Sequence, residues 1–323
     1  MTDVAALAAA AGIGELVAAP VVLKRGSVAC WRVTTSRGDF HVKRFAVRDP
    51  ALAVCAEIER AAQRAGVSLA EPIALGVDVD GEVVHVHRWW HGRPLEPGDE
   101  IAGWLGATLA TLHTLPPPSS APADALTSYY GLHPEAAWRT WFRDGRSRGL
   151  AWAERDEPLA AVLAASDVIA AGLAAESRRA GTHRDLLGAN ILRNGAALAL
   201  IDWDCAGPDV PWFEAVRAAI EFGRLAATVD GMRPLQPDPG VSRAILAAYE
   251  QAGGERGVTG VLGLAGVLGM AQWRIAFAVQ VSLGDRAAPP DERAECTAYL
   301  PGALAKLAER ARTLESLAAA VGL

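Results

Sequence analysis

The chain has 323 residues, of which 51% are hydrophobic and 21% charged, so it is too long for one small core and far from the composition of a disordered chain. Its 31 basic and 37 acidic residues give a formal net charge of -6 with no dense run of lysine or arginine, which excludes a nucleic-acid backbone as the expected partner. The four cysteines lie far apart without paired spacing, which argues against a disulfide framework or a zinc site and favours a cytoplasmic protein.

Two apolar segments resemble membrane-targeting sequences. Residues 4–20 lack a basic leader and contain Glu15, so we expect a surface or packing helix there and no signal peptide. Residues 258–273 are uncharged but shorter than the roughly 20 residues that a membrane span needs. We therefore predict a buried helix at 258–273 and no membrane partner.

The first 90 residues predict a small antiparallel sheet with one main helix. Residues 20–46 read as three short strands with turns at Arg25-Gly26 and at 36–39. Apolar residues at helical spacing follow over 51–66, and 71–90 predicts two more strands around a turn. The expected order is therefore β-β-β-α-β-β.

The rest of the chain is predicted to be mostly helical. A helix over 99–115 is closed by three prolines, and one β-like stretch occupies 190–202. Further helices are expected at 135–143, 157–178, 211–228, 241–252, 258–283 and 291–319. The predicted class is α+β, with a smaller N-terminal lobe at 1–92 and a larger helical lobe at 93–323.

The β-like stretch brings oxygen-bearing side chains together. Asn194-Gly195 between apolar runs is a strong hairpin signal, and a hairpin there places Asn190 and Asp202 at neighbouring strand ends, one loop after Asp185. Phosphoryl transfer needs an acid that accepts or orients the attacking hydroxyl, and oxygen ligands that hold Mg²⁺ against the nucleotide phosphates. Asp185 alone is as typical of a loop or helix cap, but the joint pattern favours catalysis.

The spacing also matches a known catalytic loop. His183, Arg184 and Asp185 are followed by Asn190 five residues after the aspartate, which is the spacing of kinase catalytic loops. With HRDLLGANIL at 183–192 and LALIDWDCAGPDVPWFE at 198–214, the sequence resembles the aminoglycoside phosphotransferase family of the protein-kinase-like superfamily, and looks like an actinobacterial member.

The resemblance implies a protein-kinase-like fold of two lobes and assigns roles to the motif residues. Asp185 is expected to be the catalytic acid/base or orienting group, and Asn190 and Asp202 are expected to ligate magnesium. Trp203-Asp204 replaces the Phe-Gly of protein kinases, which leaves Asp204 as a second metal contact or as none. His183 is expected to pack under the site and hydrogen-bond the backbone.

The resemblance also implies an ATP or GTP site in the N-terminal lobe. Lys43 takes the place of the lysine that contacts the α- and β-phosphates, and Glu57 is expected to hold it, with Glu59 as the alternative. His41 lies two residues before Lys43, hence on the same strand face, and is expected to stack on the base. The backbone of 88–92 is the expected hinge beside the base.

The first turn departs from the glycine-rich flap of protein kinases. It has a single glycine, so Gly26 and Ser27 are expected to form a less glycine-rich phosphate loop of the kind that the family uses. His85, His87 and His91 lack the accompanying ligand spacing of a metal site, so we expect them to pack in the strand and the hinge.

The acceptor is expected to be a small hydroxylated molecule. A peptide-directed protein kinase requires a long activation segment with an A-P-E anchor, and no such segment follows Asp202. Residues 203–260 hold eight acidic residues against five arginines, which slightly favours a basic antibiotic and leaves macrolides, peptide antibiotics, sugars and amino alcohols open.

Two alternatives to a small-molecule kinase remain at this point. One is a peptide-directed Ser/Thr kinase of a natural-product pathway, which a groove lined by Trp138, Trp141 or Trp212 would favour. The other is a catalytically silent nucleotide-binding module. A monomer and a homodimer are both compatible with the sequence.

Overall fold

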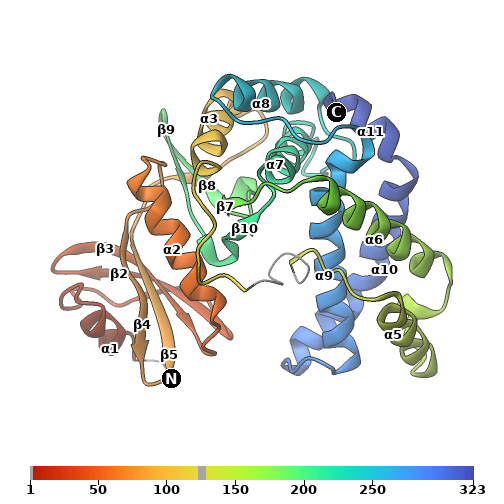
Figure 1. Ribbon diagram of the computed structural model, residues 1–323. Helices are drawn as coiled ribbons and strands as arrows, with labels where there is room; N and C mark the ends of the chain where they lie inside the picture. The colour runs from red at the N-terminus through yellow and green to blue at the C-terminus, as the bar shows by residue number, and fades with distance from the viewer. Residues whose placement is uncertain (1–2, 123–128) are drawn as a thin grey trace. The chain divides into compact units, whose positions relative to one another are not determined.

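The computed structural model describes residues 3–122 and 129–323, and the chain forms two compact units (Figure 1). Unit 1 consists of Met1–Asp99, Thr111–Ala121 and Gly181–Gly207. Unit 2 consists of Glu100–Ala110, Pro122–Ala180 and Pro208–Leu323. The predicted lobe boundary after residue 92 divides the chain differently and stays a prediction.

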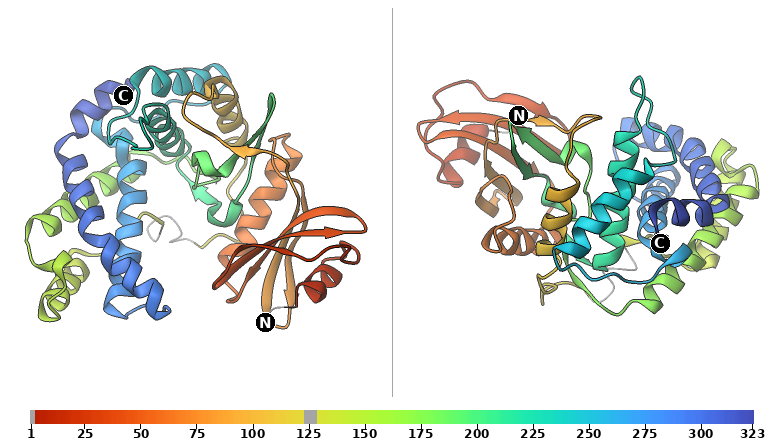
Figure 2. Two further views of the ribbon diagram at one scale, coloured as in Figure 1. Left: turned by 180° about the vertical axis from the view of Figure 1, so that it is seen from behind. Right: turned by 90° about the horizontal axis from the view of Figure 1, so that it is seen from above.

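Unit 1 contains a five-stranded antiparallel sheet in the order β1-β2-β3-β5-β4. Its strands are β1 (Val21–Lys24), β2 (Val28–Thr35), β3 (Gly38–Phe45), β4 (Pro72–Val79) and β5 (Glu82–Arg88). The helix α2 (Ala51–Arg64) lies between β3 and β4 in the sequence, which confirms the predicted order. In Figure 2, α2 lies on one side of this sheet and α1 (Val4–Ala10) on the other.

The two faces of the sheet differ because alternate side chains point to opposite sides. Val33, Val42, Val84 and Val86 are 0% exposed and pack in the apolar core with Leu7 of α1. Polar side chains of the same strands point the other way. They are Cys30, His41, Lys43, His85 and His87, and they line a cavity.

The N-terminal helix is shorter than the predicted segment. Asp3 caps α1 by accepting hydrogen bonds from the amides of Ala5 and Ala6 at 3.0 and 3.2 Å. Gly12 and Gly14 then adopt φ of +67° and +94°, a left-handed backbone that ends the helix. The remainder of residues 4–20 is therefore not helical.

The predicted hairpin forms in unit 1 as β8 (Ile191–Asn194) and β9 (Ala197–Leu200), which a short strand β6 (Arg93–Pro94) extends to three strands. Asn194 pairs with Ala197, so the two loop residues are Gly195 and Ala196, and Gly195 has φ of +59°. The short 3₁₀ turns η2 (Gly188–Asn190) and η3 (Trp203–Cys205) flank the hairpin. The chain passes between the units within β7 (Ala180–Thr182) and β10 (Gly207–Asp209).

Unit 2 is helical, as predicted. Its central helix α9 packs against α6, α7 and α10. Gly269 of α9 lies so close to Tyr130 that an added Cβ would come within 1.7 Å of the ring, which explains a glycine in this apolar helix. Among the described residues, the helices are α3 (Ala102–Leu112), α5 (Glu135–Ser147), η1 (Ala151–Ala153), α6 (Glu157–Ala175), α7 (Pro211–Ala226), α8 (Pro239–Gln251), η4 (Gly260–Leu264), α9 (Ala265–Leu283), α10 (Pro290–Arg312) and α11 (Leu314–Val321), with the end of α3 in unit 1.

Two stretches, Glu157–Ala175 and Gly260–Leu283, are long and apolar enough to cross a membrane by length and composition alone. The second is 61% buried over its most apolar window, which agrees with the predicted buried helix. The exposed positions of the first are mostly alanines, together with Glu157 and Asp167. Both stretches therefore fit the surface and core of a helical bundle.

Candidate active site

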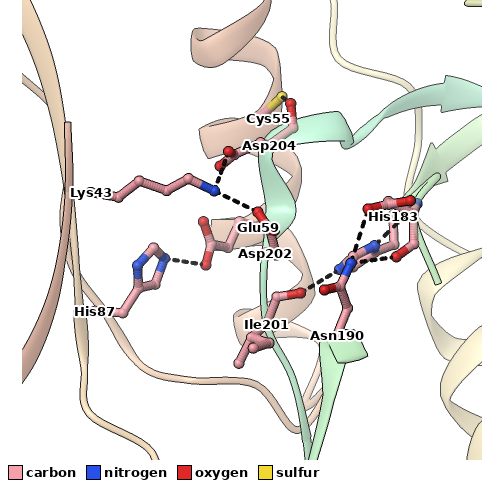
Figure 3. A network of polar contacts seen from close by, with 10 residues as sticks. Lys43, Cys55, Glu59, His87, His183, Asn190, Ile201, Asp202 and Asp204 are labelled. Carbon is pink, nitrogen blue, oxygen red and sulfur yellow. Dashed lines mark hydrogen bonds and ion pairs between the residues drawn. The ribbon is translucent and has the colours of Figure 1, made fainter. Parts of the chain in front are cut away.

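Lys43 lies between the carboxylates of Asp202 and Asp204, and we call these three residues the Lys43 cluster (Figure 3). The Nζ atom of Lys43 donates a hydrogen bond to Oδ1 of Asp202 at 2.6 Å and forms an ion pair with Asp204. The Lys43 side chain is 10% exposed, whereas the side chains of Asp202 and Asp204 are 41% and 25% exposed. The carboxylates therefore remain accessible to a second cation.

The Lys43 cluster has a left-handed backbone at Asp202 and shifted pKa values at all three of its residues. Asp202 has φ of +64° and ψ of +65°, a left-handed conformation that is uncommon outside glycine. Burial alone lowers the pKa of Lys43, but Asp204 and Asp202 outweigh it and raise that pKa. Burial raises the pKa of Asp202, yet Lys43 outweighs burial and lowers it. The pKa of Asp204 stays raised, because burial and the charge of Asp202 together exceed the effect of Lys43.

Asp185 and Asn190 are joined directly. The amide Nδ2 of Asn190 donates to Oδ2 of Asp185 at 3.0 Å and to its backbone oxygen at 2.8 Å. The backbone amide of Ile201 donates to the backbone oxygen of Asn190 at 3.0 Å, so Asn190 and Asp202 lie at neighbouring ends of the hairpin, as predicted.

His183 holds the loop that carries Asp185 through contacts with the backbone. Its ring is 0% exposed and lies 4.6 Å from the ring of Trp203 between centroids. Its Nε2 atom lies 3.0 Å from the carbonyl oxygen of Ile201, and the amide of Asp185 donates to Nδ1 at 3.4 Å. The ring is therefore buried and hydrogen-bonded to the backbone, which confirms the predicted structural role of His183.

A cavity of about 350 Å³ adjoins the Lys43 cluster, and those of its lining residues that the structure describes all belong to unit 1. This volume is within the usual range of small-molecule sites. His41 lines it, as do Arg88, Trp89, Trp90 and Gly92 of the predicted hinge. Asp185 and Asn190 are not among its lining residues.

His41 and His85 are neutral rings in this environment. Burial lowers the pKa of His41 to about 4, with further contributions from His87 and Lys43. Burial likewise lowers the pKa of His85 to about 4, and His85 pairs directly with Lys43 across the two strands. His85 is buried and His87 is half-buried, and both line the cavity from β5, whereas His91 is exposed, so the packing predicted for His91 is wrong.

The structure does not bring Glu57 to Lys43. Glu57 accepts a hydrogen bond from Oγ of Ser120 at 3.1 Å and borders a separate hollow. Glu59 is 1% exposed, lines the cavity and lies 2.7 Å from Nε2 of His87. Residues two apart on a helix point about 200° apart, so only one of the two faces the sheet. The signal was present, because Glu59 lies four residues after buried Cys55.

Gly26 and Ser27 also lie away from the cavity. Gly26 is exposed with φ of +126° and borders a different hollow together with Arg25 and Arg44. Leu23 and Lys24, at the end of β1, line the cavity instead. The sequence interpretation missed Lys24 because it assigned the phosphate loop to the turn itself.

The model of a family described as phosphotransferase enzyme family (APH) matches residues 4–258. No curated protein sequence matches the chain. Among solved structures, a spectinomycin phosphotransferase in complex with ADP and spectinomycin is similar with a TM-score of 0.61 and 14% identity, over 93% of this chain and 95% of that one. An amicoumacin kinase in complex with AMP-PNP and Ca²⁺ gives 0.56 and 12%, over 90% and 88%. A choline kinase from Cryptosporidium parvum gives 0.57 and 12%, over 91% and 90%.

Proposed function

The chain belongs to the phosphotransferase enzyme family, and on that premise we propose that it transfers the γ-phosphoryl group of ATP or GTP to a hydroxyl of an antibiotic or a similar small molecule. One observation supports this proposal above all: unit 1 contains both the Lys43 cluster, with its buried lysine and two accessible carboxylates, and the hydrogen-bonded pair of Asp185 and Asn190. Phosphoryl transfer depends mostly on such positioning and charge stabilisation.

The cavity is the proposed nucleotide site. Its walls include the apolar and aromatic side chains Leu23, Trp89, Trp90, Leu192 and Ile201, which suit a flat purine base. Neutral His41 also lines the cavity, where its ring can stack on a base without an unpaired charge. Similar proteins have been solved with ADP or AMP-PNP, which supports a nucleotide for this chain.

The donor set fits a magnesium ion. Nδ2 of Asn190 is engaged by Asp185, so its amide oxygen is the atom left for a cation, and Asp202 and Asp204 add carboxylate oxygens. Hard divalent cations prefer such oxygen ligands. When bound, Mg²⁺ would supply neutralisation of the phosphate charge. Lys43 then provides a further positive charge beside the same phosphates.

Asp185 is the proposed catalytic residue. Asn190 donates a hydrogen bond to Oδ2 of the Asp185 carboxylate, and His183 accepts one from the Asp185 backbone amide. The side chain and the backbone of Asp185 are therefore both held in place. An oriented carboxylate accepts the proton of an attacking hydroxyl or aligns that hydroxyl with the phosphorus. We place this chemistry in the cytoplasm, where free cysteines stay reduced, with a monomer or a homodimer as the working form.

The described side chains favour a small acceptor over a peptide. Of the three tryptophans that an exposed peptide groove would use, Trp138 and Trp212 are 0% and 2% exposed and Trp141 is half-buried. The acidic residues of 203–260 are mostly neutralised within the chain, for example Glu221 by Arg233 and Glu255 by Arg178. This favours an acceptor that carries few positive charges.

The test is release of nucleoside diphosphate from Mg²⁺-ATP or Mg²⁺-GTP across aminoglycosides, macrolides, peptide antibiotics, sugars and amino alcohols. We expect acceptor-dependent turnover with wild type and a loss of about 10²–10⁴ in rate with Asp185→Asn. Nucleotide binding without turnover on every small acceptor would instead support the peptide-directed kinase or the silent module.

A further inference from the structure

The strand β1 ends in a bulge at the edge of the cavity. Val22 pairs with Trp31 and Lys24 pairs with Cys30, so Leu23 is an extra residue in β1 without a partner in β2. In a regular strand, Leu23 and Lys24 would point to opposite faces of the sheet, but a bulge re-aims one of the two. Leu23 and Lys24 accordingly both line the cavity.

The strand register places Lys24 and Lys43 in one row. Lys24 lies opposite Cys30 on β2, and Cys30 lies opposite Lys43 on β3. Directly paired residues have their side chains on the same face, so the two lysines share the cavity face. They are two strand spacings apart, which is about 10 Å between backbones. Burial raises the pKa of the Cys30 thiol between them, and Lys43 and Lys24 both oppose that rise.

Of the described residues that line the cavity, three have a cationic side chain, namely Lys24, Lys43 and Arg88, and the last two have interaction partners within the chain. Lys43 is held by its two carboxylates. Arg88 donates to the backbone oxygen of Arg37 at 3.0 Å, and its guanidinium lies over the ring of Phe40. Among the residues that the structure describes, none forms an ion pair or a side-chain hydrogen bond with Lys24, which is exposed. Its ammonium group is therefore available to an anionic ligand.

We propose that Lys24 binds the phosphate chain of the nucleotide. Glycine-rich flaps hold phosphates with backbone N–H groups, whereas the turn after Lys24 has one glycine, and its residues Arg25, Gly26 and Ser27 do not line the cavity. The bulge supplies a charged side chain in place of that flap, and charge-assisted contacts to phosphate are among the stronger hydrogen bonds. This inference rests on the proposed nucleotide site and extends it by one residue.

Titration calorimetry of ATP, ADP and AMP, with Ca²⁺ to suppress turnover, tests the proposal on Lys24→Met. We expect about tenfold weaker binding of ATP and ADP and a change below about twofold for AMP. Lys24→Arg keeps the charge and should restore most of the lost affinity. Arg25→Met is the matched control, because Arg25 belongs to the same turn but borders only the other hollow.

Three results would overturn the proposal. Unchanged ATP affinity in Lys24→Met would remove Lys24 from the site. Equal losses for ATP, ADP and AMP, or an equal loss in Arg25→Met, would indicate a general effect on β1. If wild type binds none of the three nucleotides, the proposed function itself fails, and this outcome differs from a wild type that binds with Lys24 contributing nothing.

Discussion

The Lys43 cluster of unit 1 and a second cluster of unit 2 carry the same charges in opposite surroundings. In unit 2, Arg217 lies 3.6 Å from Oδ2 of Asp209 and 3.6 Å from Oε1 of Glu214, and we call these residues the Arg217 cluster. Both of its carboxylates are 0% exposed, whereas Asp202 and Asp204 are 41% and 25% exposed. The same charge set thus serves as a sealed structural element in one unit and as an open site in the other.

The comparison shows that exposure decides what an ion cluster contributes. A buried pair that loses one partner leaves a charge that neither water nor protein neutralises. A cluster at the edge of a cavity loses little stability, because water solvates the carboxylates that remain. Mutations should therefore separate stability from activity between the two clusters.

The largest expected effect is on the Arg217 cluster. Arg217→Met leaves two carboxylates buried without their cation and should lower the free energy of unfolding by about 3–5 kcal/mol. Urea denaturation followed by circular dichroism measures this loss. Arg243→Met, at an exposed arginine of α8, should change the free energy by less than about 0.5 kcal/mol. A similar, small change in both variants would contradict the structural role of Arg217.

The Lys43 cluster should show the reverse behaviour. Lys43→Met removes a charge beside the proposed phosphates and should lower kcat/KM by about 10²–10³-fold, which corresponds to about 3–4 kcal/mol. Its free energy of unfolding should change by less than about 1 kcal/mol. Steady-state kinetics and urea denaturation on the same preparation check both halves. A strongly destabilised variant with normal kinetics would assign Lys43 to structure alone.

Acid should act on the cavity side of unit 1. His85 is 3% exposed, and its pKa in the folded protein is lowered to about 4 from the ordinary value near 6.5. Between these two pH values the His85 ring stays neutral in the folded protein but takes up a proton in the unfolded chain. Its contribution to stability is therefore complete above pH 6.5 and is lost as the pH falls toward 4. Between pH 7 and 5 this amounts to about 2 kcal/mol.

The variant His85→Leu isolates that contribution. Its free energy of unfolding should fall less between pH 7 and 5 than that of wild type, whereas His91→Gln, at an exposed histidine, should follow wild type. Urea titrations at the two pH values provide the comparison. Parallel losses in wild type and His85→Leu would mean that other groups cause the acid sensitivity.

The smallest expected effect concerns the hydroxyl beside the Arg217 cluster. Tyr130 donates a hydrogen bond to Asp209, and burial together with the charge of Asp209 raises its pKa, so the hydroxyl keeps its proton. Tyr130→Phe should lower the free energy of unfolding by about 1.5 kcal/mol without changing kcat/KM. An unchanged free energy would show that the amide of Val210, which donates to Oδ1 of Asp209 at 2.7 Å, satisfies that oxygen without the tyrosine.

Local signals predicted much of the fold and part of the site. The Asn194-Gly195 pair and the spacing from Asp185 to Asn190 are short-range features, so the sequence predicts the hairpin and the convergence of these side chains at one rim. The direct hydrogen bond from Asn190 to Asp185 and the shift of the loop to Gly195-Ala196 come only from the structure. Helix phase was harder to use, because Glu57 and Glu59 differ by two positions; the spacing of four residues from Cys55 to Glu59 favours Glu59, which is the buried one, whereas Glu57 bonds Ser120.

Long-range pairings could not be predicted at all. The β1 bulge depends on register against β2, which no pattern within β1 indicates. The neutralisation of the acidic residues of 203–260 depends on partners such as Arg178, outside that segment. A count of charges therefore described the composition of the segment but not the charge that an acceptor would meet.

The left-handed backbone of Asp202 has a consequence for directed evolution, because the substitution that relieves it also removes a proposed Mg²⁺ ligand. Within residues 3–122 and 129–323, the non-glycine residues with positive φ are Asp80 and Asp230 in turns, and Arg184 and Asp202 beside the proposed catalytic groups. Such a conformation disfavours folding by about 1–2 kcal/mol, which glycine would avoid. Asp202→Gly would relieve that cost at the expense of the ion pair with Lys43 and would discard a proposed Mg²⁺ ligand, so a screen of this enzyme for heat resistance has to score turnover in every round.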